Sequence, residues 1–95
     1  MTPEAKVKKD IRKILDAYGC YYAMPVGTGY GNSGVPDFLV CHKGRFIGIE
    51  AKAGKGTTTA LQEANLERIV KAGGYAFVIR ENTLDTVAML LQGDV

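Results

Sequence analysis

The residues of this sequence best suited to chemistry are two carboxylates and a lysine in two short motifs. Asp37 ends a Gly-Val-Pro-Asp segment at 34–37, and a Glu-Ala-Lys segment that begins with Glu50, thirteen residues after Asp37, ends at Lys52. If residues 38–49 form a hairpin, Asp37 and Glu50 meet at one end of it, and the Lys52 ammonium lies nearby. Carboxylate oxygens are the hard ligands that Mg²⁺ and Mn²⁺ prefer. This combination suits the hydrolysis of phosphodiester bonds.

A metal ion also explains how Asp37 and Glu50 could both stay ionised. Adjacent carboxylates raise each other's pKa unless a cation lies between them. The backbone carbonyl of Ala51 is a candidate third ligand, and Lys52 would orient the attacking water or neutralise the charge on the reacting phosphate. An isolated Glu-x-Lys tripeptide is commonly an exposed pair on a strand, so this interpretation depends on the conjunction with the Pro-Asp motif.

Helices and strands are predicted around these motifs from hydrophobic periodicity and from Gly and Pro breakers. The chain should begin with a helix that Thr2 caps and Gly19 ends. The predicted elements are a helix at 3–18, strands at 20–24, 38–42 and 45–52, a helix after the threonines at 57–59, a strand at 75–79, and a last helix capped by Asn82 or Thr83.

The order αβββαβα predicts an α/β fold with a mixed four-stranded sheet flanked by helices. The turn at Lys43 and Gly44 makes the second and third strands antiparallel, and the helix before the fourth strand makes a parallel crossover. With 95 residues and 46% hydrophobic content, the chain should form a single domain over 1–95. Alternation within 45–52 places Glu50 and Lys52 on one face of their strand.

Two flanking residues could extend the site. Glu4 lies three residues before Val7, so it continues the apolar stripe of the first helix with a carboxylate. It could favour the helix dipole and point to water, or it could face a cation beneath the helix. Gln62 lies near the start of the helix that follows the Glu-Ala-Lys strand.

Nucleic-acid binding is suggested by the distribution of charge and not by its total, since the net charge is only +2. Five basic residues fall within residues 6–13, which could form a solvated helix face or a face that contacts phosphates. The segment 27–34 contains four glycines and a tyrosine that could stack on a base. The candidate DNA contacts are Lys6, Lys9, Lys13, Tyr30 and Lys55.

The cysteines and the histidine do not suggest a second site. Cys20 and Cys41 lack a CxxC spacing and are most simply buried thiols in a reducing cytosol. His42, which lies at the hairpin end of its strand, is expected to be a surface residue. No apolar run is long enough for a signal peptide or a membrane span, so we expect a cytoplasmic protein.

The two motifs resemble the signature of a known nuclease family. Residues 34–37, residues 50–52 and Gln62 are similar to the GxPD, ExK and Gln signature of the VRR-NUC domain, a branch of the PD-(D/E)xK nuclease superfamily. The resemblance covers nearly the whole chain, because Glu4 falls where the family has a Glu on its first helix. It implies a restriction-endonuclease-like core and hydrolysis of DNA that depends on Mg²⁺ or Mn²⁺.

The resemblance also implies a role for each residue. Asp37 and Glu50 would be metal ligands, Lys52 the catalytic lysine, Gln62 a residue that positions the water or the lysine, and Glu4 an accessory acid near the metal. Stand-alone members of this size resemble phage-encoded proteins, which would place this one in the host-cell cytoplasm. Minimal members of the family are linked to homodimers that cut branched DNA such as Holliday junctions.

The sequence therefore predicts a metal-dependent, structure-selective DNA endonuclease that acts as a homodimer. One alternative is a non-catalytic module that binds DNA junctions or DNA ends and supports a partner enzyme. The intact set of Asp37, Glu50 and Lys52 argues against it, because binding alone does not need these groups. A plain α/β structural or interaction domain makes no use of the carboxylates and ranks last.

Overall fold

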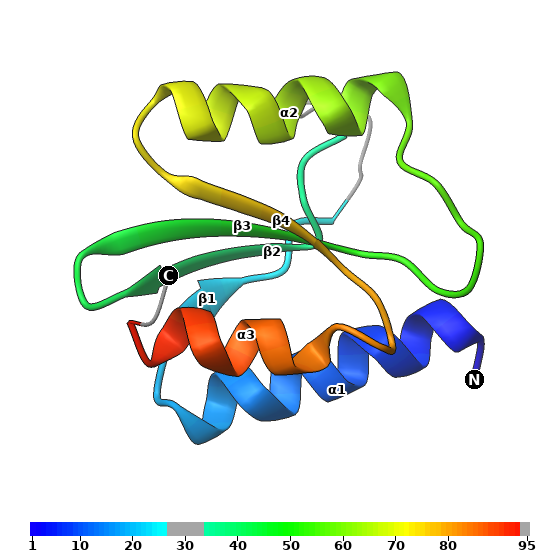
Figure 1. Ribbon diagram of the computed structural model, residues 1–95, viewed down its shortest axis with the longest axis horizontal. Coiled ribbons are helices and arrows are strands. Elements are labelled where there is room, and N and C mark those ends of the chain that lie inside the picture. The colour runs from blue at the N-terminus through cyan, green and yellow to red at the C-terminus, as the bar shows by residue number, and fades with distance from the viewer. Residues whose placement is uncertain (27–33, 94–95) are drawn as a thin grey trace.

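A four-stranded sheet between helices forms the body of the protein, shown in Figure 1 as a computed structural model that describes residues 1–26 and 34–93. Helix α2 covers one face of the sheet, and helices α1 and α3 lie side by side on the other (Figure 1). Within the described residues the elements are α1 (Pro3–Ala17), β1 (Tyr21–Ala23), β2 (Phe38–His42), β3 (Arg45–Ala51), α2 (Ala60–Lys71), β4 (Tyr75–Ile79) and α3 (Leu84–Leu91).

The topology of the sheet is the one predicted from the sequence. The strands lie in the order β1-β2-β3-β4, with antiparallel pairs β1–β2 and β2–β3 and a parallel pair β3–β4. Helix α2 makes the crossover between the two parallel strands. This α/β arrangement, with the element order αβββαβα, is consistent with a restriction-endonuclease-like fold.

The hydrophobic core lies between the sheet and the pair α1 and α3. Helix α1 is capped by Thr2, whose Oγ1 accepts a hydrogen bond of 3.1 Å from the Ala5 N–H. Alternate residues of β2 and β3 point into the core from the sheet. The buried core residues are Val7, Ile11, Leu15, Phe38, Val40, Ile47, Ile49, Ala51, Ile79, Val87 and Leu91.

Two glycines allow α2 to approach the other face of the sheet closely. A Cβ on Gly48 would lie 2.6 Å from Cδ1 of Ile69, so a side chain on this residue of β3 would displace the Ile69 side chain from the sheet. Gly34 has φ +84°, and a Cβ there would lie 2.6–2.8 Å from backbone atoms of Leu61 and Gln62. The first turn of α2 is therefore seated directly on the glycine of the Gly-Val-Pro-Asp motif.

Some local predictions were wrong. Strand β1 is shorter than the predicted 20–24. In α2, which was predicted from hydrophobic periodicity, the apolar residues Leu61 and Val70 are exposed. Gln62 contacts Glu50 of the sheet. Each residue turns an α-helix by about 100°, so the preceding residue, Leu61, points away from the sheet.

The cysteine and histidine predictions were also wrong. Residues of β2 alternate between the core face and the face that carries α2, and His42 points to the core face, where it is 8% exposed. Its Nδ1 lies 3.4 Å from the Sγ of Cys20, which is half-buried. Cys41 points to the other face, where α2 does not cover it, and is exposed. No helix in the described part of the chain is long and apolar enough to cross a membrane.

Candidate active site

The register of the hairpin places Asp37 beside Glu50. Phe38 pairs with Ile49, so Asp37, the residue before Phe38, falls opposite Glu50. Side chains directly opposite in an antiparallel pair lie on the same face, with Cβ atoms about 4.5–5.5 Å apart. The N–H of Ala51 donates a hydrogen bond of 2.8 Å to Oδ2 of Asp37, which fixes the orientation of this carboxylate. The predicted meeting of the two acids at one end of the hairpin is therefore observed.

Glu50 is a buried carboxylate that has one oxygen engaged and one oxygen without a partner. The residue is 2% exposed, because it lies under the first turn of α2. Its Oε2 accepts a hydrogen bond of 3.2 Å from Nε2 of Gln62 and lies 3.7 Å from Nζ of Lys52, whose side chain is 12% exposed. Its Oε1 is buried and has no hydrogen-bond partner among the residues that the structure describes.

These surroundings strongly favour the protonated form of Glu50. Burial raises the pKa of Glu50 to about 8, and the neighbouring charge of Asp37 adds to the rise. Lys52 opposes it, and the charge of Glu4 makes a smaller contribution in the upward direction. Two neighbouring carboxylates in a dry site thus lack enough positive charge to be ionised together at neutral pH.

Gln62 connects the start of α2 to this carboxylate. The side-chain Oε1 of Gln62 accepts a hydrogen bond of 2.9 Å from the backbone N–H of Thr59. The backbone N–H of Gln62 donates to Oγ1 of Thr59, which completes a capping box. Because Oε1 is held in this way, Nε2 is directed at Glu50. The capping box therefore both begins α2 and orients a side chain of the site.

Glu4 lies near the two acids, but a lysine stands between it and Asp37. Nζ of Lys8 is 3.4 Å from Oδ1 of Asp37 and 3.8 Å from Oε2 of Glu4. Lys8 was not among the predicted site residues, although its i,i+4 spacing from Glu4 could have indicated it. Within residues 1–26 and 34–93, no group of three or more His, Cys, Asp and Glu side chains is placed to hold a metal ion.

The backbone around Lys52 is held by residues at the end of β4 that were not predicted to belong to the site. The N–H of Lys52 donates to the carbonyl of Ile79 at 3.0 Å, which extends the parallel pairing of β3 and β4. Beyond it, the N–H of Gly54 donates to both carboxylate oxygens of Glu81, at 2.9 and 3.2 Å, and Arg80 donates to the carbonyl of Gly54 at 3.1 Å. A polar pair just after β4 could have indicated this contact, because the ends of parallel strands meet at one edge.

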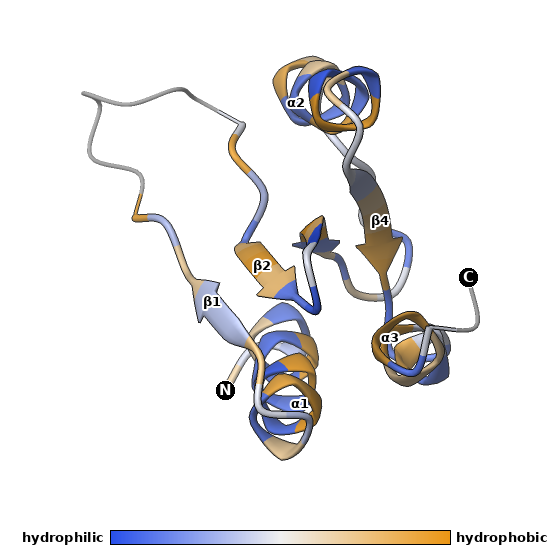
Figure 2. Cartoon of the chain, turned by 90° about the vertical axis from the view of Figure 1, so that its left-hand side faces the viewer, coloured by the Kyte–Doolittle hydropathy of each residue, from blue (hydrophilic) through white to orange (hydrophobic). Residues whose placement is uncertain are grey.

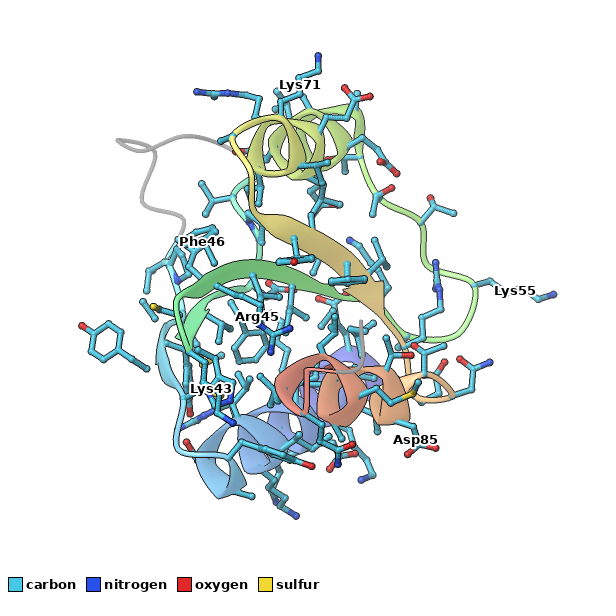
Figure 3. All side chains as sticks on the ribbon, turned by 60° about the vertical axis from the view of Figure 1, so that its left-hand side comes forward. Lys43, Arg45, Phe46, Lys55, Lys71 and Asp85 are labelled. Carbon is cyan, nitrogen blue, oxygen red and sulfur yellow. The ribbon has the colours of Figure 1, made fainter. Side chains whose placement is uncertain are left out.

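None of the candidate DNA contacts in the described residues forms a salt bridge with Asp37 or Glu50. Lys6 forms an ion pair of 3.1 Å with Asp10 and lies two residues from Lys8, about 160° around the helix. Lys55 points away from the body of the molecule (Figure 3). Tyr30 lies outside the described residues. The exposed candidates are Lys6, Lys9, Lys13 and Lys55.

Comparisons with known proteins were made by sequence and by structure. A scan against protein-family models finds no match, and a search of curated proteins finds none. Among solved structures, a "VRR_NUC domain" matches with a TM-score of 0.77 and 26% identity, over 97% of this chain and 97% of that one. This match supports a VRR-NUC domain protein. A "VRR_NUC domain protein" matches the fold with a TM-score of 0.72 and 19% identity, over 98% of this chain and 88% of the other.

The acidic pair of Asp37 and Glu50 fits a hard divalent cation. Asp37 and Glu50 offer oxygen ligands side by side, and Oε1 of Glu50 has no partner in the described part of the chain. A divalent charge here would favour the ionised form of Glu50 and so counteract the effect of burial. Mg²⁺ usually keeps several waters, so two carboxylates and a backbone carbonyl would suffice to bind it.

We predict that the metal-free protein loses stability as the pH rises from about 4.5 to about 8. In this range the folded protein keeps the Glu50 proton while the unfolded chain has released it, so raising the pH favours unfolding. The expected loss is on the order of 2–4 kcal/mol. Glu50→Gln should remove it, so that in EDTA the variant is more stable than the wild type at pH 8 and about equally stable at pH 5.

Urea unfolding across this pH range measures the effect. Glu67→Gln, the same change at an exposed glutamate of α2, is the matched control and should follow the wild-type profile. If Glu50→Gln and the wild type showed the same dependence on pH, Glu50 would not be the group that holds the proton.

Proposed function

We propose that this chain is an endodeoxyribonuclease that depends on Mg²⁺ or Mn²⁺ and hydrolyses phosphodiester bonds, with residues 1–95 forming a single nuclease domain. The observation that supports it best is the pairing of Asp37 with the buried Glu50, next to Lys52 and Gln62. The VRR-NUC fold, which is of the nuclease type, supports the same reaction. A structural domain would gain no stability from burying a carboxylate beside another one.

Each residue of the site has a separate role in this proposal. Asp37, Glu50 and the carbonyl of Ala51 would hold the metal, with Glu4 as an accessory acid. The bound metal would supply a Lewis acid for the phosphate and lower the pKa of a water molecule. Lys52, largely dry, orients the attacking water or stabilises the charge that develops on the phosphate. Gln62 holds the Glu50 side chain in place through its hydrogen bond.

The substrate proposed is branched DNA such as a Holliday junction. The exposed lysines of α1 and Lys55 would contact phosphates, and Tyr30 would stack on a base. Such contacts carry no sequence information, which suits an enzyme that selects DNA by its structure. The competing proposal, a module that binds junctions or DNA ends for a partner enzyme, requires DNA binding without metal uptake.

We predict that Asp37→Asn and Glu50→Gln each reduce cleavage by at least about 100-fold while leaving DNA affinity within about threefold of wild type. Either change removes a charge that the metal needs, but neither alters the basic surface that binds phosphates. The assay is a cleavage panel of four-way junction, flap, splayed-arm and linear DNA with Mg²⁺ or Mn²⁺. Binding is measured in EDTA at one fixed salt concentration, so that wild type and variants are compared without metal.

Matched controls make the same chemical changes away from the site. Asp85→Asn on α3 and Glu67→Gln on α2 alter exposed acids and should leave cleavage unchanged. The nuclease proposal fails if the wild type leaves every DNA of the panel intact with both metals, or if Lys52→Ala cuts as well as the wild type. DNA binding without any metal uptake would favour the binding module.

We further propose that the chain acts as a homodimer. Within the described residues, helix α2 packs on β4 and β3, away from the edge strand β1 (Figure 2). Tyr21, Cys41 and Phe46 form a row across three strands there, since Tyr21 pairs with Cys41 and Cys41 with Phe46. Tyr21 is 80% exposed and Phe46, labelled in Figure 3, is 45% exposed. Exposed aromatic side chains gathered beside a free strand edge favour association with a second copy.

Light scattering should therefore give a particle of twice 10.2 kDa. Phe46→Arg would place a charge in the proposed interface and should shift the protein to monomers. Val70→Arg is the control, because Val70 is similarly exposed but lies on α2, and it should leave the dimer intact. A monomer mass for the wild type would contradict the dimer and leave symmetrical cutting of a junction by one particle without explanation.

A further inference from the structure

Lys8 holds the position at which the proposed function requires a cation, and the inference drawn from it rests on that function. Its Nζ lies 3.4 Å from Oδ1 of Asp37 and 3.8 Å from Oε2 of Glu4. The other oxygen of Asp37, Oδ2, already accepts the hydrogen bond from Ala51. Oδ1 is therefore the Asp37 oxygen most open to a metal, and it is the one that Lys8 occupies.

The ion pairs of Lys8 are weak enough for another cation to replace its ammonium. Both of its ion-pair distances are longer than a hydrogen bond, and its side chain is 35% exposed. Ion pairs that reach solvent contribute little net stability, and a lysine ammonium moves on a flexible four-carbon stem. Lys52 differs in this respect, because its side chain is only 12% exposed and it lies against the buried Glu50.

We propose that Lys8 is an exchangeable counter-ion of the active site. It neutralises Asp37 while no divalent cation is bound, and it moves to a phosphate of the DNA when a cation takes the Asp37 oxygen. Positive charge would then remain beside the carboxylates in both states. The released ammonium would lie next to the reacting strand, so metal binding would create a DNA contact.

The first test measures metal affinity by calorimetric titration with Mn²⁺. Lys8→Met removes the competing ammonium while keeping a long side chain, and should tighten binding about 10-fold relative to wild type. Lys9→Met loses the same charge at an exposed neighbour and should change the affinity less than twofold. Equal effects of the two variants, or no effect of Lys8→Met, would overturn the exchange.

The same titration separates this inference from the proposed function. If the wild type binds Mn²⁺ and Lys8→Met binds it with the same affinity, the exchange is wrong while the metal site stands. If neither the wild type nor Lys8→Met takes up Mn²⁺, both proposals are overturned.

The second test asks whether the DNA contact depends on the metal. Binding of a synthetic four-way junction is measured in Ca²⁺ and in EDTA over a range of salt concentrations. Lys8→Met should weaken binding severalfold in Ca²⁺ and lower the salt slope by about one, with no change in EDTA. A merely structural role would not produce this difference. Equal weakening in both conditions would show a permanent contact and overturn the exchange.

Discussion

The pairing register of strands β2 and β3 directs their apolar residues into the core. The pairs Phe38–Ile49 and Val40–Ile47 are both buried against α1 and α3, and this same register sets Asp37 opposite Glu50. A slip of one residue would turn the apolar residues of one strand to the face under α2 and Glu50 into the core. The packing that stabilises the fold thus also brings the two carboxylates together.

The second constraint is the close approach of α2, which buries Glu50 and supplies its hydrogen-bond donor. This approach depends on Gly48 in β3 and on Gly34 under the first turn of the helix. Burying one of two neighbouring carboxylates costs stability, and the rise in the pKa of Glu50 reflects that cost. Such a cost is typical of a site that is arranged for a ligand and not for stability.

Much of this arrangement could be predicted from the sequence. Strict alternation in 45–52 and the Lys43-Gly44 turn define the hairpin, and the two motifs then predict that Asp37 and Glu50 meet. The role of Lys8 could not be predicted, because the sequence shows it only as one of five bases near the N-terminus. Its contact with Asp37 depends on how α1 is rotated against the sheet. The prediction that Cys41 is buried was wrong for a related reason. Alternation defines the two faces of a strand but not how far a helix covers each face.

The central claim is that Asp37 and Glu50 together hold a divalent cation. The most direct measurement is anomalous diffraction from crystals grown with Mn²⁺. The account predicts a single strong peak between the two side chains, with an oxygen of each at roughly 2.0–2.5 Å. A peak elsewhere on the molecule, or ordered Asp37 and Glu50 side chains with no peak between them, would contradict it.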